Sequence, residues 1–481
     1  MSDYDVVIGL EVHVQIKTDS KMFCSCPNKY GDEPNTLTCP VCTGQPGALP
    51  VPNRKAIEKT IIAGMMCECS VSKFSKFDRK SYFYPDMAKN YQISQYDLPF
   101  CLNGKIYVYG KGFSGKEIES KIIGITRIHL EEDAAKSTHF ANSSGIDYNK
   151  GGVPLMEIVS EPDISSADEA YAYLSAIKQI MQYGAIGNCD MEKGQMRCDV
   201  NISLKPAGRK KFGTKIELKN MNSFRAIHRA INYEISRQAD VLDEGGSLVQ
   251  ETRGWNDDKG RTYLMRVKES EQDYRYFPEP DLMPVVFTDE ELNDFRNKLP
   301  ELPEDIRKRF VKDYELTDYD SQVLTAEKDI AMFFDKASTK TKTPKLLANW
   351  IISELLREIS KSELSIKEIK IKPEDLALLV ELINNKTISG KIAKTVFNDM
   401  FKTGKSPEVI VKEKGLVQVT DESVIENFVK EAIESNPAQV QQYKEGKTAV
   451  LQFFVGQVMK LSRGKANPQA VIKYLKSMLD S

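Results

Sequence analysis

The hydrophobic pattern of this 481-residue chain changes once, between residues 299 and 303. Before this point, short segments alternate apolar and polar residues, as half-buried strands do. After it, apolar residues recur at intervals of three and four, as in PKLLANWIISELLREI with Leu347, Ile351 and Leu355. The chain is therefore expected to adopt an α+β fold, in which a mixed-sheet part precedes an all-helical part.

Turn dipeptides such as Asn-Gly and Gly-Gly separate the alternating segments of the first part. Helices are expected at about 54–67 and 166–183, and the last two helices near 447–462 and 468–479. The domains predicted from these patterns are residues 1–291, 292–404 and 405–481. The strands are expected at 6–16, 105–110, 122–130, 153–159 and 200–204.

The formal net charge is -2, so a nucleic-acid partner would have to be bound by a local basic patch. No segment approaches the ~20 apolar residues of a membrane helix, and the N-terminus lacks the pattern of a signal peptide. We therefore expect a cytoplasmic protein. Its nine cysteines are then expected to be reduced, and either buried or bound to metal.

The first strand carries Glu11 and His13 on one face, because side chains alternate along a strand. Two further acidic segments follow, one with Glu131 and Glu132 and one with Glu157 inside an apolar stretch. A buried carboxylate there needs either a metal or a basic partner. Glu11, His13, Glu157 and one of Glu131 or Glu132 would form an oxygen-rich site suited to Mg²⁺ and ATP phosphates. The alternative is a strand whose polar face meets water.

Cys24-x-Cys26 and Cys39-x-x-Cys42 are separated by twelve residues. Two close pairs on two loops can complete a tetrahedral site for structural Zn²⁺. The alternative is four unrelated reduced thiols. We expect the remaining five cysteines to pack in the core.

Several longer segments occur in the order found in one family. They include GLEVHVQI, KFDRKSYFYPDMAKNYQISQ, RIHLEEDAAKSTH, VPLMEIVSEPD, GTKIELKNMNSF and FFVGQVMKLSRGKANP. Together they resemble the B subunit of aspartyl/glutamyl-tRNA amidotransferase along nearly the whole chain. The resemblance implies a cradle-like catalytic domain at 1–291, a helical domain at 292–404 and a tail domain at 405–481 similar to the YqeY proteins.

The resemblance also implies an activity and partners. The side-chain carboxylate of misacylated Glu-tRNA(Gln) or Asp-tRNA(Asn) would be phosphorylated by ATP and then amidated with ammonia. A glutaminase (A) subunit would supply the ammonia, and a small C subunit would complete a heterotrimer. A non-catalytic tRNA-binding scaffold with a structural zinc is the competing interpretation.

The family's Mg²⁺ ligands, which are also its catalytic residues, correspond to Glu11, His13, Glu132 and Glu157. Strand parity instead favours Glu131 as the third carboxylate, so both remain open.

Basic and aromatic side chains lie close together in the segment that begins KFDRK, a combination suited to a single-stranded tRNA 3′ end. Core tyrosines are the alternative there. In the tail, basic residues near a helix end could bind a backbone phosphate, and the resemblance implies contacts with the tRNA elbow there; a solvated charged face is the alternative. No P-loop motif occurs, so ATP would be bound by another fold. The candidate substrate- and tRNA-binding residues are Lys76, Arg79, Lys80, Tyr82, Phe83, Tyr84, Tyr91, Lys219, Asn220, Arg275, Lys460, Arg463 and Lys465.

Overall fold

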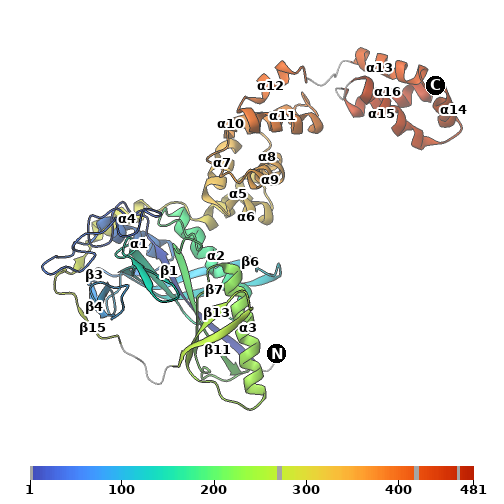
Figure 1. The fold of residues 1–481 in the computed structure, drawn as a ribbon. Coiled ribbons are helices and arrows are strands. Elements are labelled where there is room, and N and C mark those ends of the chain that lie inside the picture. Colours follow the sequence, from blue (N-terminus) through green and yellow to red (C-terminus); the bar gives the residue numbers. More distant parts are fainter. Residues whose placement is uncertain (1–3, 268–273, 417–421, 463–465, 481) are drawn as a thin grey trace. The chain divides into compact units, whose positions relative to one another are not determined.

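The computed structural model describes residues 4–267, 274–416, 422–462 and 466–480 (Figure 1). The chain divides into two compact units, residues 1–303 and 304–481. No helix among the described residues has the length and apolar character needed to span a bilayer.

A nine-stranded sheet organises the first unit. All neighbouring strands run antiparallel except β12 and β13, which are parallel. The order across the sheet is β14 (Arg261–Val267), β13 (Glu251–Asn256), β12 (Ile216–Lys219), β11 (Met196–Pro206), β1 (Tyr4–Gln15), β10 (Pro154–Ser160), β7 (Glu117–Glu132), β6 (Cys101–Lys111) and β2 (Ser70–Val71).

One face of this sheet is covered by helices α1 (Arg54–Met66), α2 (Ala167–Tyr183) and α3 (Phe224–Asp243) (Figure 1). The apolar side chains of β1 lie in the same buried core as apolar side chains of these helices. Asn53, Ser166 and Ser223 cap the three helices by accepting hydrogen bonds from backbone N–H groups of their first turns. The opposite face of β1 carries polar residues, including Glu11, His13 and Gln15.

Three small sheets complete the first unit. Helix α4 (Asp289–Asn297) places Leu292 and Phe295 in the first unit's core. The small sheets pair β15 (Tyr276–Pro278) with β4 (Asp78–Ser81) and β4 with β5 (Tyr91–Ser94), β16 (Val285–Val286) with β3 (Phe74–Ser75), and β8 (Lys136–His139) with β9 (Ser144–Asp147).

The described residues of the second unit are helical, and the last helices form a core of their own around Val429, Phe454 and Leu475. The first group is α5 (Pro303–Tyr314), α6 (Asp318–Thr325), α7 (Lys328–Ser338), α8 (Pro344–Trp350), the π-helix η1 (Ile351–Leu355), α9 (Leu356–Ser362), α10 (Pro373–Asn384), α11 (Gly390–Thr403) and α12 (Pro407–Glu413). The last group is α13 (Glu422–Glu434), α14 (Pro437–Lys444), the 3₁₀ helix η2 (Thr448–Val450), α15 (Leu451–Leu461) and α16 (Pro468–Leu479).

The α+β fold class expected from the sequence is confirmed. The expected strands overlap β1, β6, β7, β10 and β11, with differences of one residue at the end of β1 and the start of β10, and the expected helices correspond to α1, α2, α15 and α16. Helix α4 packs in the core of the first unit, and α12 packs on α10 and α11. The domain boundaries at residues 291 and 404 stay predictions.

Candidate active site

Histidine and carboxylate side chains from three adjacent strands meet on the face of the large sheet opposite the helices. His13 on β1 is the cross-strand partner of Glu157 on β10, and Glu157 is the partner of His129 on β7. The Nε2 atoms of His13 and His129 lie 3.3 Å and 3.4 Å from Glu157 Oε2. Glu157 therefore stands between two imidazoles.

Two further carboxylates complete this cluster. Glu11 Oε1 lies 3.8 Å from His13 Nε2, and Glu131 Oε2 lies 3.7 Å from His129 Nε2. Ser94 Oγ donates a hydrogen bond of 3.0 Å to Glu131 Oε2. Glu11, His13, Glu157, His129 and Glu131 are called the His/Glu cluster below.

For His129 and Glu157, burial and the neighbouring charges act on the side-chain pKa in opposite directions. Burial alone would lower the pKa of His129, but Glu157 and Glu131 raise it to about 9. Burial would likewise raise the pKa of Glu157, yet His129 and His13 hold it well below its usual range. Burial and the neighbouring Glu157 raise the pKa of Glu11. The cluster thus holds buried negative charge that imidazolium groups or a cation must balance.

The donor atoms of the cluster lie close enough together to bind a metal ion. One set is Glu11, His13 and Glu157, and the other is His129, Glu131 and Glu157; within each set the ligand atoms lie within 4.8 Å of one another. Carboxylate oxygens with few nitrogens are the donors expected for a hard divalent cation such as Mg²⁺. The residues present therefore fit this ion.

Glu132 lies apart from the His/Glu cluster. Its carboxylate forms a buried ion pair with Lys89 and accepts a hydrogen bond of 2.9 Å from the backbone N–H of Ile93. Because Glu131 and Glu132 are consecutive in β7, their side chains point to opposite faces of the sheet. Of the two, the structure brings Glu131 to Glu157.

His129 is the member of the cluster that the sequence reasoning missed. It precedes Glu131 by two residues in β7, so both must share a face. The same parity that favoured Glu131 could have identified His129.

Asp133 occupies a second buried polar position beyond the end of β7. It accepts hydrogen bonds from Gln15 Nε2 at 3.0 Å and from an Arg197 guanidinium nitrogen at 2.9 Å. Lys150 Nζ lies 3.1 Å from Oδ2, the same Asp133 oxygen that accepts from Gln15. Arg197 is also the cross-strand partner of His13, so this carboxylate fixes a cation beside the His/Glu cluster.

Several of the expected binding residues are engaged by neighbouring acidic groups. Arg79 forms a two-pronged ion pair with Glu279, with distances of 2.6 and 2.9 Å. Lys76 pairs with Asp78 and lies 2.6 Å from Asp97. These two cations are therefore partly neutralised within the protein.

The ammonium group of Lys80 interacts electrostatically with the His/Glu cluster. Burial would lower the pKa of its ammonium group, but Glu131 and further groups including Glu157 raise it. Its Nζ also lies 4.8 Å from the ring centre of Tyr274. Lys80 thus adds positive charge in the neighbourhood of the cluster's carboxylates.

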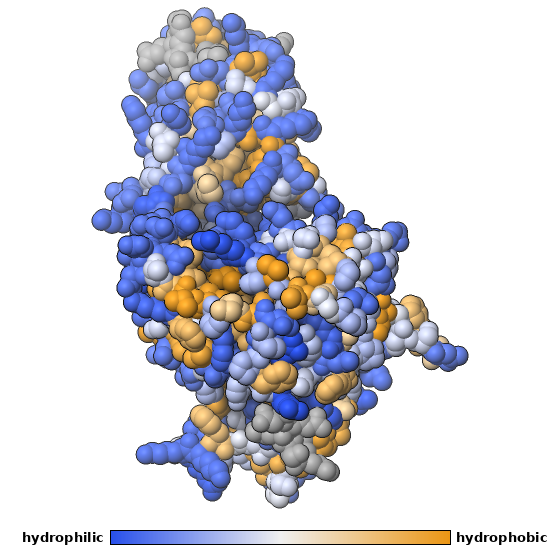
Figure 2. All heavy atoms as spheres, turned by 90° about the vertical axis from the view of Figure 1, so that its left-hand side faces the viewer, coloured by the Kyte–Doolittle hydropathy of each residue, from blue (hydrophilic) through white to orange (hydrophobic). Residues whose placement is uncertain are grey.

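The aromatic side chains after β4 lie partly in solvent. Phe83 and Tyr84 are 76% and 55% exposed, and the Tyr84 ring is 4.7 Å from that of Tyr82. The Arg79 guanidinium instead lies over the ring of Tyr91, and its Cζ atom is 4.2 Å from the ring centre. Figure 2 views the molecule from the side on which β3, β4 and β15 lie and shows apolar side chains gathered there between hydrophilic ones.

The other expected binding residues are dispersed. Lys219 ends β12 and pairs with Asp199 and Glu217, while Asn220 follows it with a positive φ of 67°. Arg275 and Lys460 are exposed. Arg463 and Lys465 lie outside the described residues.

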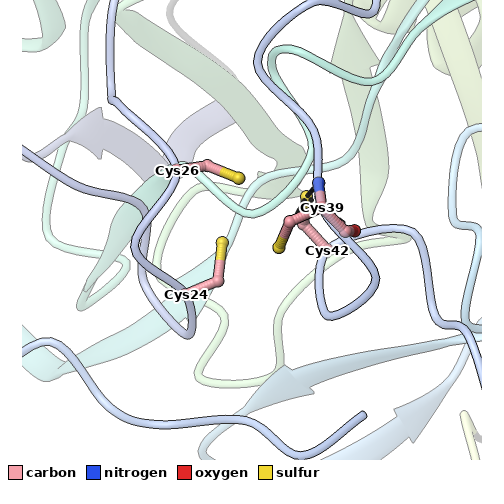
Figure 3. Close-up of side chains that lie close together, drawn as sticks. All are labelled: Cys24, Cys26, Cys39 and Cys42. Atoms are coloured by element: carbon pink, nitrogen blue, oxygen red, sulfur yellow. Dashed lines mark hydrogen bonds between the residues drawn. The ribbon is translucent and has the colours of Figure 1, made fainter.

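The four cysteines of the expected zinc site come together. Figure 3 shows Cys24 and Cys26 on one loop and Cys39 and Cys42 on another, with their sulfurs directed into a shared space. The four sulfurs lie within 4.8 Å of one another. The hydrogen bond with Cys24 lowers the pKa of Cys42 to about 4, whereas burial raises that of Cys26 to about 11. Four thiol groups in this arrangement fit a tetrahedral Zn²⁺ site.

The cysteine loops touch the segment that holds the end of β7. A Cβ atom on Gly44 would lie 3.0 Å from the Cα of Lys89, the partner of Glu132, and its φ of +66° favours glycine. A Cβ on Gly152 would lie 3.5 Å from Cys42 Cβ and 3.9 Å from Glu132 Oε2. The cysteine loops therefore support the strand end that presents Glu131.

Two family models match this chain, one within the first unit and one within the second. Residues 6–293 match the family model described as the GatB/GatE catalytic domain, and residues 332–479 match the one described as the GatB domain. The fold and site thus define an α+β domain of the GatB/GatE catalytic type followed by a GatB-type helical region.

Relatives similar over the full length define the family further. The chain is 51% identical to the B subunit of the aspartyl/glutamyl-tRNA(Asn/Gln) amidotransferase from Thermoanaerobacter pseudethanolicus over 480 residues, covering 99% of both chains. It is 52% identical to the protein of the same name from Persephonella marina over 478 residues, covering 99% of this chain and 100% of the relative. The chain belongs to the family of aspartyl/glutamyl-tRNA(Asn/Gln) amidotransferase B subunits.

Proposed function

We propose that this chain activates the side-chain carboxylate of misacylated Glu-tRNA(Gln) or Asp-tRNA(Asn) with ATP and directs its amidation. The observation that carries this proposal is the His/Glu cluster, a partly buried set of side chains that could hold a divalent cation on the face of the sheet opposite the helices. The names of the relatives, which are amidotransferase subunits, agree with it.

In the activation step, an oxygen of the substrate carboxylate attacks the γ-phosphorus of ATP. The bond from that phosphorus to the β,γ-bridging oxygen breaks, giving ADP and an acyl phosphate. Ammonia then adds to the acyl carbon, phosphate leaves, and the nitrogen loses a proton to give the amide. Catalysis of phosphoryl transfer rests mainly on positioning and charge neutralisation.

We assign the Mg²⁺ ligands to Glu11, His13 and Glu157, with Glu131 rather than Glu132 as the further carboxylate. When bound, Mg²⁺ neutralises phosphate charge and orients the γ-phosphate. The chain's own residues hold that position: cross-strand pairing fixes Glu157 against His13 and His129, and Ser94 orients Glu131. Lys80 and Arg197 add positive charge next to the same carboxylates.

The exposed side chains of Phe83 and Tyr84, together with the half-buried Tyr82 that packs on Tyr84, are proposed to stack on bases of the single-stranded tRNA 3′ end. Arg275 is an exposed cation available to its phosphates. Lys460 near the end of α15 is proposed to contact the tRNA elsewhere. Lys76 and Arg79 are given a supporting role, because acidic groups already pair with them.

Membership of the B-subunit family implies a heterotrimer with a glutaminase (A) subunit, which releases ammonia, and a small C subunit. The cysteine cluster is proposed to bind a structural Zn²⁺. Four thiolates complete a tetrahedral coordination and leave no position open for a reactive water molecule. Four reduced cysteines that bind zinc are typical of a reducing compartment, so we propose that the protein is cytoplasmic.

The test is amidation of Glu-tRNA by the assembled complex, with wild type compared with Glu157→Gln. Glu58→Gln on α1 is the matched control, since Glu58 pairs only with its neighbours Arg54 and Lys55 among the ion pairs of the described residues. We expect Glu157→Gln to keep releasing ammonia from glutamine but to form no Gln-tRNA. Amidation at the wild-type rate would reject the catalytic role and favour a non-catalytic tRNA-binding scaffold.

A further inference from the structure

Lys21 is a lysine next to the cysteine cluster, and none of its surface is exposed. Lysine is almost never fully buried in proteins unless a partner compensates its charge, because an ammonium group loses its hydration there. No ion pair within the described residues joins Lys21 to a carboxylate. Its ammonium group instead contacts a cysteine sulfur and a backbone oxygen. The negative charge that balances Lys21 therefore has to come from elsewhere.

The side chain of Lys21 reaches from one cysteine loop to the other. Its backbone N–H donates a hydrogen bond of 2.9 Å to the carbonyl oxygen of Cys26, so Lys21 lies at the base of the first loop. Its Nζ lies 3.7 Å from the sulfur of Cys42 on the second loop (Figure 3). The same Nζ donates a hydrogen bond of 3.0 Å to the carbonyl oxygen of Tyr148.

The sulfur of Cys42 receives a second donor. The backbone N–H of Cys39 points at Cys42 Sγ at a distance of 3.2 Å. A neutral thiol sulfur is only a weak acceptor, whereas hydrogen bonds to an ionised acceptor are considerably stronger. An ammonium group and a backbone N–H on one sulfur are therefore expected where that sulfur is a thiolate.

A zinc ion would not neutralise the cysteine cluster completely. The ligands of Zn²⁺ are thiolates rather than thiols. Four thiolates carry four negative charges and the ion carries two positive charges, so the centre retains two negative charges. A buried anionic centre is stabilised by a nearby cation, and the ammonium group of Lys21 lies 3.7 Å from one of its sulfurs.

We propose that Lys21 is the counter-cation of the zinc–thiolate centre. Its ammonium group offsets one of the two remaining negative charges and thereby increases the affinity of the cysteine cluster for Zn²⁺. This role of Lys21 rests on the proposed function, which places Zn²⁺ in the cluster, and adds to it a residue outside the four ligands. Through Tyr148, Lys21 also attaches the zinc centre to the segment that leads into β10, the strand of Glu157.

The competing interpretation is that Lys21 only joins two segments through its hydrogen bond to Tyr148, with its charge balanced by Glu132. A Cβ atom on Gly152 would lie 3.5 Å from Lys21 Cδ and 3.9 Å from Glu132 Oε2, but Glu132 is already paired with Lys89. A purely structural lysine predicts an equal loss of stability with and without zinc and an unchanged zinc affinity.

The experiment measures the zinc affinity of the full chain by competition with a chromophoric chelator under reducing conditions. Lys21→Met removes the charge and keeps a long side chain. Lys21→Gln, which keeps a neutral donor, is measured beside it and replaces it if the methionine variant does not fold. The matched control is Lys59→Met, because Lys59 Nζ also donates to two backbone carbonyl oxygens, those of Lys17 at 2.7 Å and Ala185 at 2.6 Å, neither of which lies in a cysteine loop.

We expect both Lys21 variants to bind Zn²⁺ at least about tenfold more weakly than the wild type, as loss of a partner next to the ligands usually does. The stabilisation that Zn²⁺ gives against urea should fall correspondingly. Lys59→Met should bind Zn²⁺ like the wild type. With Co²⁺ as an optical probe, the sulfur-to-metal charge-transfer band should move to longer wavelength in Lys21→Met, because a cation beside the sulfur makes its electrons harder to remove.

Wild-type zinc affinity in both Lys21 variants would overturn this role, whatever their stability, and would leave the proposed function standing. A charge-transfer band at the wild-type position would overturn it too, because a change of charge beside the sulfur has to move the band. A wild-type chain that binds no zinc would instead refute the zinc site of the proposed function.

Discussion

The two adjacent carboxylates at the end of β7 offer a test in which stability and metal binding should separate. Glu132 lies in a buried pair with Lys89, and their side chains are 3% and 9% exposed. Glu131 lies in the His/Glu cluster. Replacing each by glutamine changes charge with almost no change in shape.

Glu132→Gln should mainly destabilise the first unit. The glutamine oxygen can still accept the Ile93 N–H, but the Lys89 ammonium loses its carboxylate. Removing one partner of a buried ion pair costs about 3–5 kcal/mol, and the retained hydrogen bond favours the lower value. A loss of about 3 kcal/mol lowers the folding equilibrium constant roughly hundredfold.

Glu131→Gln should mainly weaken metal binding. It removes a carboxylate whose oxygen lies 3.7 Å from His129 Nε2, while the amide can still accept the Ser94 hydroxyl. We expect the affinity for Mn²⁺, used as a probe in place of Mg²⁺, to fall by at least about tenfold. The change in unfolding free energy should be smaller than that of Glu132→Gln.

Urea unfolding followed by circular dichroism measures the loss of stability expected for Glu132→Gln. Calorimetric titration with Mn²⁺ measures the loss of metal affinity expected for Glu131→Gln. Each variant is the control for the other. If Glu132→Gln lost Mn²⁺ binding while keeping wild-type stability, Glu132 would be the ligand, and the assignment of the two side chains to their faces would be wrong.

Three further outcomes follow from the described contacts. The purified chain should contain about one zinc ion by elemental analysis, and Cys39→Ser should lose it whereas Cys69→Ser, outside the cysteine cluster, should retain it. Tyr84→Ala should raise the KM for Glu-tRNA about fivefold or more without changing ADP affinity, because its exposed ring is proposed to stack on a base; an unchanged KM would remove it from the tRNA contacts. Burial would raise the pKa of Asp133, but Arg197 and other groups including Lys150 hold it below its usual value. Its folded pKa is thus depressed, so its stabilisation is present above about pH 4 and lost as pH falls through the folded value. In urea titrations across this range, Asp133→Asn should be less stable at neutral pH and should lose less stability on acidification; parallel pH profiles would contradict this.

The sequence by itself was sufficient for features that depend on near neighbours. Alternation along residues 6–16 placed Glu11 and His13 on one face of a strand, and the spacing of Cys24, Cys26, Cys39 and Cys42 indicated two loops of paired thiols. The helical part after residue 303 was likewise evident, since apolar spacing is local and reports directly on the backbone conformation.

Only the tertiary structure decided which distant segments meet. The strands adjacent to β1 are β10 and β11, and this choice brings Glu157, about 150 residues away, against His13. The register of β7 then adds His129 and Glu131 and turns Glu132 to Lys89. Likewise, Arg79 is neutralised by Glu279, 200 residues further along the chain. Strand order and register come from packing of the whole sheet, so no local pattern contains them.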